Sequence, residues 1–455
     1  MFGLGLERYL PEALYAGGII AVLLSLFWRP AIGIYYLIPL IPMQTLRYRL
    51  IPFPMGESVV GIVLVSVVIG LLVRGQLRGP KAGVGVVLAV YAGYTLLSLF
   101  YGALYLGVSL PIWVTDPRLK EWQNYMMMPM LLVTTAAAIR TRFEIWIVLG
   151  LMAFSAFGMN NSLWSTLGNR DMSTYSEGLA EAGAMGQAGT NGLAAFEAQF
   201  AATLLVFVGK LRSFSVKAIL LGLAGLTVAC MLYSFSRGGY AAFLVGCIFL
   251  VLVSYKKLLV IPVVFLLFWT SLVPPAVRER VQMTYDGGGG SLDDSSETRL
   301  ALWSDAFSML KKSPVIGTGF YTYAFMGRMK AGAGHTYADT HNYFVKTFLE
   351  GGLVGLAIFL FLFWRMFKAG MNLYSRAPDD HLMAALGLGL AVWAVSSAVA
   401  NMFGDRWSFL QVNGYMWLLT GLVCSAHMML EQAGTDASAL ETPDETCAPE
   451  TAITV

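Results

Sequence analysis

Charged residues are scarce in this sequence. Only 13% of its 455 residues are charged, whereas soluble domains usually carry about 25%. Hydrophobic residues make up 57% of the chain, and the mean hydropathy is +0.66. This composition excludes an ordinary soluble domain and indicates a polytopic membrane protein.

Histidine and cysteine are also scarce, at four residues each. The cysteines lie in apolar runs or in the C-terminal tail, so they predict neither a disulfide framework nor a CxxC metal site. No P-loop, GxSxG, HExxH or dinucleotide fingerprint stands in a suitable context. The net charge of +3, without a basic run, gives no sign of nucleic-acid binding. We therefore expect no metal, no other cofactor and no nucleic acid.

Long apolar runs are what the chain has in abundance. Each run of about 20 apolar residues can form one membrane-spanning helix. We expect an all-α fold with about 12–13 transmembrane helices and a long helical periplasmic loop. The first two runs are short and could instead form a broken or re-entrant pair. The expected spans are residues 12–28, 31–43, 58–73, 84–106, 126–139, 143–158, 190–209, 217–235, 239–254, 258–273, 342–367, 382–403 and 409–429.

The spans divide the chain into three parts. An N-terminal transmembrane region, residues 1–189, carries an outer loop at 159–189. A second transmembrane region, residues 190–430, contains the long outer loop 274–340. The polar tail, residues 431–455, has too few apolar residues for a core and is expected to be disordered and cytoplasmic.

Short loops rich in Lys and Arg mark the cytoplasmic side of a membrane protein. Such loops fall at every second connection here, so one topology satisfies all of them and directs every long loop outward. We expect membrane lipids around the spans and the functional face on the outer side, opposite these loops. The loops carry Arg74, Arg78 and Lys81; Arg140 and Arg142; Lys210, Arg212 and Lys217; Lys256 and Lys257; and Arg365, Lys368 and Arg376.

The long outer loop contains a predicted amphipathic helix at residues 295–312. Its apolar face would comprise Leu300, Trp303, Phe307 and Leu310. Arg299 lies in the first turn and shares a helix face with Trp303. Glycine clusters at 287–290 and 332–334 suggest a mobile lid.

Two arginines on the outer side could bind an anion. Arg237 stands in the stretch Ser236-Arg-Gly-Gly, between two apolar runs, where it is either a snorkelling anchor or an anion clamp. Gly238 would let a ligand approach the backbone there. Arg406 is expected to pair with Asp405, although it could extend the clamp.

His341 begins the span that follows the long loop. We expect Asp339 or Thr340 to cap that helix. A neutral imidazole there could accept a proton from a hydroxyl, or it could merely mark the membrane interface. Asn342 could orient the ring or a substrate.

Five short motifs together resemble the signature of the O-antigen ligase and O-antigen polymerase superfamily of bacterial inner membranes. The resemblance covers residues 190–430, and the motifs run in the family order. They are Ser236-Arg-Gly-Gly, Arg299 with Trp303, Pro314-Val-Ile-Gly-Thr-Gly, His341-Asn342, and Glu350-Gly-Gly with Gly355.

The resemblance implies an inverting, metal-independent glycosyltransferase of the ligase type. Such an enzyme moves a glycan from undecaprenyl diphosphate to an acceptor hydroxyl at the periplasmic face. The acceptor would be lipid A-core or another glycan or a protein. Arg237 and Arg299 would hold the diphosphate, and His341 would be the base. Polymerisation of repeat units shares this chemistry and remains an alternative, as does a polysaccharide transporter or flippase.

Overall fold

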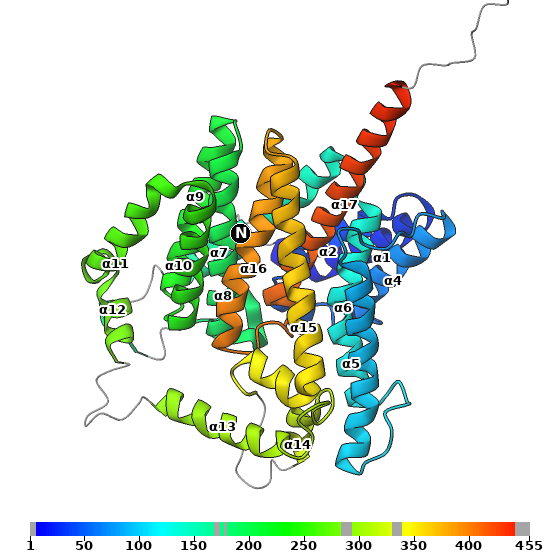
Figure 1. The fold of residues 1–455 in the computed structure, drawn as a ribbon, viewed down its shortest axis with the longest axis vertical. Coiled ribbons are helices and arrows are strands. Elements are labelled where there is room, and N and C mark those ends of the chain that lie inside the picture. The colour runs from blue at the N-terminus through cyan, green and yellow to red at the C-terminus, as the bar shows by residue number, and fades with distance from the viewer. Residues whose placement is uncertain (1–5, 168–172, 177–179, 284–293, 330–338, 442–455) are drawn as a thin grey trace, which may run out of the picture.

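The structure is a computed structural model that describes residues 6–167, 173–176, 180–283, 294–329 and 339–441 (Figure 1). Within these ranges the fold is all-α, as expected. The first half comprises α1 (Leu10–Phe27), α2 (Ala31–Leu40), α3 (Gln44–Tyr48), α4 (Val59–Val73), α5 (Gly85–Leu106), α6 (Pro117–Ala138), α7 (Arg142–Leu167) and α8 (Gly189–Lys210).

The second half contains the long connection and the last spans. Its helices are α9 (Phe214–Leu232), α10 (Arg237–Ser254), α11 (Val260–Leu272), α12 (Pro275–Gln282), α13 (Asp294–Leu310), α14 (Thr322–Met329), α15 (Tyr343–Arg376), α16 (His381–Met402) and α17 (Leu410–Glu441). The tail expected to be disordered from residue 431 begins inside α17, because that helix continues to Glu441. Residues 442–455 lie outside the described part.

The molecule is a multi-pass membrane protein. In the described ranges, nine helices are long and apolar enough to cross a membrane: α1, α4, α5, α7, α8, α9, α10, α15 and α16, with short turns preceding α4 and α8. The remaining expected spans fall on α2, α6, α11 and α17. Of these, α2 has only 10 residues and α11 only 13, which is short for a span of about 20.

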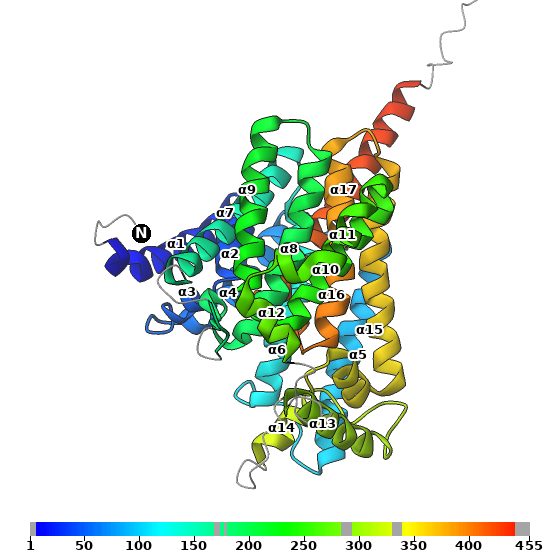
Figure 2. The same cartoon turned by 90° about the vertical axis from the view of Figure 1, so that its left-hand side faces the viewer.

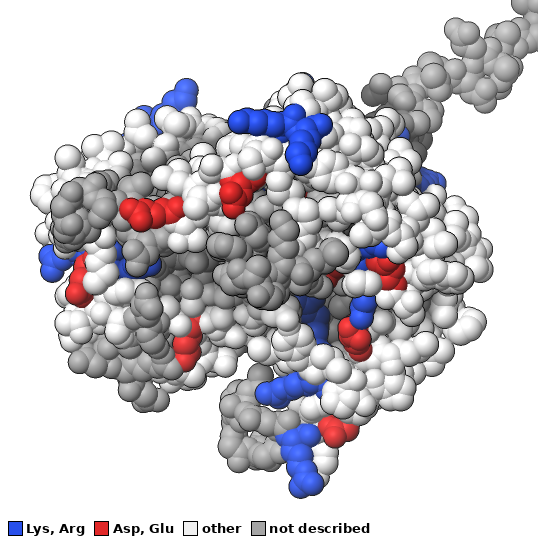
Figure 3. Space-filling view, turned by 90° about the horizontal axis from the view of Figure 1, so that it is seen from below, with Lys and Arg blue, Asp and Glu red and all other residues white. Residues whose placement is uncertain are grey.

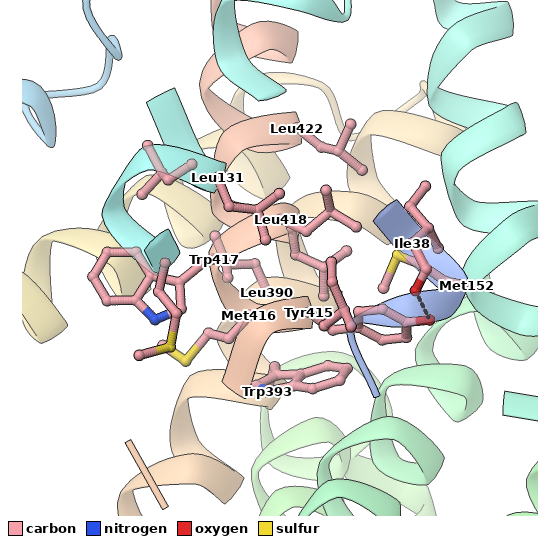
Figure 4. Close-up of a cluster of buried hydrophobic side chains, with 14 of the residues drawn as sticks. Ile38, Leu131, Met152, Leu390, Trp393, Tyr415, Met416, Trp417, Leu418 and Leu422 are labelled. Atoms are coloured by element: carbon pink, nitrogen blue, oxygen red, sulfur yellow. Dashed lines mark hydrogen bonds between the residues drawn. The ribbon is translucent and has the colours of Figure 1, made fainter. Parts of the chain in front are cut away.

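The two expected transmembrane regions share one hydrophobic core. Figure 4 shows it around α17, where Tyr415 and Trp417 pack among side chains of α2, α6, α7 and α16. The Tyr415 hydroxyl donates a hydrogen bond of 3.1 Å to the Ile38 carbonyl, so the polar end of this ring is satisfied in the core. The N-terminal helices and the C-terminal helices therefore form a single packed bundle.

The Lys- and Arg-rich loops gather at one end of the bundle, which we call the cation-rich end. Arg142 pairs with Asp380, and Lys81 pairs with Glu431 at 3.2 Å. Lys210 Nζ lies 3.1 Å from the Tyr374 hydroxyl, which also bonds to Ser254. In Figure 1 this is the upper end, and α13 and α14 lie at the opposite end in both Figures 1 and 2.

Candidate functional site

The candidate site lies at the α13 end of the bundle, which Figure 3 shows from below. On this face, charged side chains of both signs are scattered over a mostly uncharged surface. The expected glycine clusters at 287–290 and 332–334 lie outside the described residues. The site is therefore built from α10, α13, α15 and the connection between α16 and α17.

α13 packs on α15 through Ala306 and the last residue of the expected apolar face. Ala306 and Leu310 are buried against Leu349 of α15 and Tyr323 of α14. Leu300 is 52% exposed and Phe307 is 43% exposed, so this part of the apolar face is not covered by the described residues.

The stretch Pro314 to Gly319 is fixed to a break in α15. Gly352 has a φ of +61°, which interrupts the helix and leaves backbone groups without their usual partners. Thr318 N donates to Leu349 O at 2.9 Å, and Gly319 N donates to Glu350 O at 2.8 Å. Leu353 N and Val354 N donate to the carbonyls of Pro314 and Val315, each at 3.0 Å. The stretch Pro314 to Gly319 and the break in α15 thus supply hydrogen-bond partners for each other's backbone groups.

Asn342, and not Asp339 or Thr340, caps α15. Its side chain accepts hydrogen bonds from Phe344 N at 2.9 Å and Val345 N at 3.2 Å. These bonds give two backbone amides of the first turn the acceptor that a helix N-terminus otherwise lacks. The Asn342 side-chain oxygen is used as that acceptor. Asn342 therefore positions the helix that follows His341.

The His341 ring faces a carboxylate on one side. Its backbone lies in the left-handed region, with a φ of +52°, which is uncommon for residues other than glycine. Asp339 accepts a hydrogen bond from His341 N at 2.9 Å, and its other oxygen lies 3.4 Å from Nδ1. The His341 side chain is 44% exposed. Trp303 Nε1 donates to Thr340 O at 2.8 Å and so ties α13 to this segment.

Arg237 is the first residue of α10, immediately after its N-cap residue Ser236. The Ser236 hydroxyl donates to Asn191 Oδ1 of α8 at 2.6 Å. A Cβ added at Gly238 would lie 2.7 Å from the Cβ of Phe403, at the end of α16. Gly238 therefore allows close packing against Phe403.

Arg406 lies in the connection that begins at Phe403. It is 7% exposed, and its guanidinium packs over Gly404. Burial lowers the pKa of Arg406, the carboxylates of Asp339 and Asp405 raise it, and Arg299 lowers it.

Asp405 does not form the local ion pair that the sequence suggested. Its carboxylate contacts Lys346 Nζ of α15 and accepts a hydrogen bond from Ser408 N at 3.1 Å. The α16–α17 connection is thereby fixed to α15, close to its N-terminus. The structure thus ties α13, which carries Arg299, to the segment that carries His341. It also places Gly238, the residue after Arg237, against Phe403 at the start of the connection that carries Arg406.

Sequence reasoning missed several polar residues next to these segments. Lys346 and Glu350, one turn apart on α15, line a cavity of about 40 Å³. The hydroxyls of Tyr91, Tyr125 and Tyr343 form a buried hydrogen-bonded cluster at the same cavity. A lysine and a glutamate inside an apolar run were a usable signal, because ionisable residues in a span are costly. Among residues with described positions, no three His, Cys, Asp or Glu side chains are grouped as metal ligands.

A comparison with protein families matches residues 222–360 to the family described as O-antigen ligase. The match begins inside α9 and ends inside α15, and it supports the superfamily that the five motifs resemble. The matched residues include Arg237, Arg299 and His341, whereas Arg406 lies after them. The comparison with curated proteins gives no match.

Proposed function

We propose that the protein is an inverting glycosyltransferase of the O-antigen ligase type. It would move a glycan from undecaprenyl diphosphate to an acceptor hydroxyl at the periplasmic face of the inner membrane. The observation that carries this proposal is the meeting of α13 with the His341 segment, through the bond from Trp303 to Thr340 O, beside the carboxylate of Asp339. The match of residues 222–360 to the O-antigen ligase family supports the class of substrate.

In the proposed step, the acceptor oxygen bonds to the anomeric carbon while the bond from that carbon to the diphosphate oxygen breaks. The electron pair of the broken bond goes to the diphosphate, and the acceptor proton goes to His341. Attack from the side opposite the leaving group inverts the anomeric centre. The step requires a base within about 3 Å of the acceptor hydroxyl.

Asp339 prepares His341 for the role of base. A carboxylate 3.4 Å from Nδ1 favours the tautomer that carries its proton on that nitrogen, which would leave Nε2 as the acceptor. The exposure of the ring, 44%, leaves space for the acceptor. The capping bonds of Asn342 keep the following helix in place and so hold the ring at its end.

The arginines would stabilise the leaving diphosphate. Their planar guanidinium groups match phosphate oxygens and stay charged at any relevant pH. Because Arg406 is almost fully buried, its charge is poorly screened and acts strongly on a nearby anion. Arg237 and Arg299 would hold the diphosphate, with Arg406 as a third cation.

Transfer by purified protein tests the proposal. With an undecaprenyl-diphosphate-linked glycan and an acceptor, we expect His341→Ala to lower the transfer rate by about a hundredfold or more. Lys311→Ala, an exposed cation just after α13, is the control and should transfer normally. A folded His341→Ala variant with the control's rate would overturn the assignment of the base.

Ligation and polymerisation are separated by the products that accumulate in a deletion strain. Loss of a ligase leaves long lipid-linked polymer and bare acceptor. Acceptors that carry a single repeat unit would instead identify a polymerase and refute the ligase-type assignment.

A further inference from the structure

A large apolar groove lies between α7, α8 and α9, away from the candidate site. Its volume is about 680 Å³. The walls include Trp146, Phe154 and Phe157 of α7, Phe207 of α8, and Leu220 and Leu226 of α9. Figure 2 shows α9 beside α7 and α8 in the upper part of the bundle.

The groove opens into a charged hollow at the cation-rich end. This hollow has a volume of about 550 Å³ and shares Trp146, Leu211 and Val216 with the groove. Its charged walls are Arg142, Arg212, Asp379 and Asp380, with His381 beside them.

The charged groups of the hollow are only partly satisfied. Arg142 pairs with Asp380. Within the described ranges, Arg212 and Asp379 have no ion-pair partner. The Nε2 atom of His381 is buried and has no hydrogen-bond partner there. A cation, an anion and an unsatisfied ring nitrogen therefore line one opening above an apolar groove.

The depth of the groove matches one leaflet of a bilayer. Along α7 it extends from Trp146 to Phe157, and along α8 from Leu211 back to Phe200. At about 1.5 Å per residue, each wall is roughly 16 Å long. A bilayer core is about 30 Å thick, so the groove ends near the middle of the membrane.

We propose that this groove is a binding site for a zwitterionic phospholipid of the leaflet at the cation-rich end. One acyl chain fills the groove, the phosphate contacts Arg212, and the headgroup amine contacts Asp379. A polyprenyl chain from a donor held at the α13 end would enter from the opposite leaflet, whereas the lining of this groove ends near the middle of the membrane. The bound lipid would support the packing of α9, of which only 28% of the spanning window is buried within the protein.

Two glycines on α9 provide a matched pair of variants. A Cβ added at Gly222 or at Gly225 meets no atom within 4 Å, so both positions tolerate a larger side chain. Gly222 lines the groove, whereas Gly225 does not. Gly222→Leu should fill the groove, and Gly225→Leu adds the same side chain outside it.

Native mass spectrometry of protein purified in mild detergent measures the bound lipid. We expect one phospholipid on the wild type and on Gly225→Leu, and about fivefold less on Gly222→Leu, as for a loss of about 1 kcal/mol. Arg212→Gln should lower occupancy similarly, with Lys217→Gln, in the first turn of α9, as its control.

Thermal unfolding with added phosphatidylethanolamine distinguishes a loss of lipid binding from a folding defect. The added lipid should raise the unfolding midpoint of the wild type and of Gly225→Leu, but not of Gly222→Leu. Equal occupancy in Gly222→Leu and Gly225→Leu would overturn the proposal. A bound mass corresponding to a polyprenyl phosphate would also overturn it and would assign the groove to a different lipid.

Discussion

Replacing Gly317 by alanine tests how the long outer connection is held to the bundle. Gly317 has a φ of +77°, and an added Cβ would lie 2.4 Å from Gly352 N and 2.5 Å from Glu350 O. No side-chain movement relieves this clash, because the opposing atoms are backbone. The stretch from Pro314 to Gly319 must therefore move away from the break in α15.

The cost has two parts. Alanine in the left-handed region costs about 1–2 kcal/mol. Separation weakens the bonds that Thr318 N and Gly319 N donate to α15, each worth about 1 kcal/mol. We expect a total of about 3–4 kcal/mol, with the second part specific to the contact with α15.

Gly75→Ala is the matched control. Gly75 also has a positive φ, +61°, but an added Cβ there meets nothing within 4 Å. The stability of this variant is therefore lowered only by the backbone strain, about 1–2 kcal/mol. The difference between the two variants isolates the docking of one motif on the other.

Hydrogen exchange followed by mass spectrometry measures this docking locally. The amides of Thr318, Gly319 and Leu353 should exchange faster in Gly317→Ala than in the wild type. About 2 kcal/mol of lost docking corresponds to roughly a thirtyfold faster exchange. Exchange of this stretch at the rate seen in Gly75→Ala would refute the reasoning.

Three further variants test the site. Arg237→Lys should lose about 90% or more of transfer, because a point charge does not replace a bidentate fork, and near-normal transfer would contradict a clamp. Trp303→Phe removes the bond to Thr340 O and should lower stability by about 1 kcal/mol in thermal unfolding, whereas an unchanged midpoint would make the bond irrelevant. Lys346→Met should cost about 3 kcal/mol or more because it leaves Asp405 buried and unpaired, and adding Asp405→Asn should recover part of that loss; no recovery would argue against the pair.

Composition and charge predicted the bundle and its two ends because both depend on local sequence. Apolar runs specify helices in a membrane, and Lys and Arg in short loops specify a side. Contacts such as the one between Lys81 and Glu431 agree with the grouping of these loops.

Details of the site depend on contacts between distant segments, which one sequence does not reveal. Asp339, Thr340 and Asn342 are all suitable N-cap residues, and only the backbone geometry selects Asn342. Asp405 was assigned to its neighbour Arg406, whereas folding brings Lys346 closer to it. Motif spacing likewise gave no indication that Pro314-Val-Ile-Gly-Thr-Gly would dock on Glu350-Gly-Gly.

A structure of the protein with undecaprenyl diphosphate bound tests the proposed site most directly. We expect the two phosphates within about 3 Å of the guanidinium groups of Arg237, Arg299 and Arg406, with His341 facing the glycan side. Phosphates at the cation-rich end, beside Arg212, or anywhere out of reach of these three arginines would contradict it.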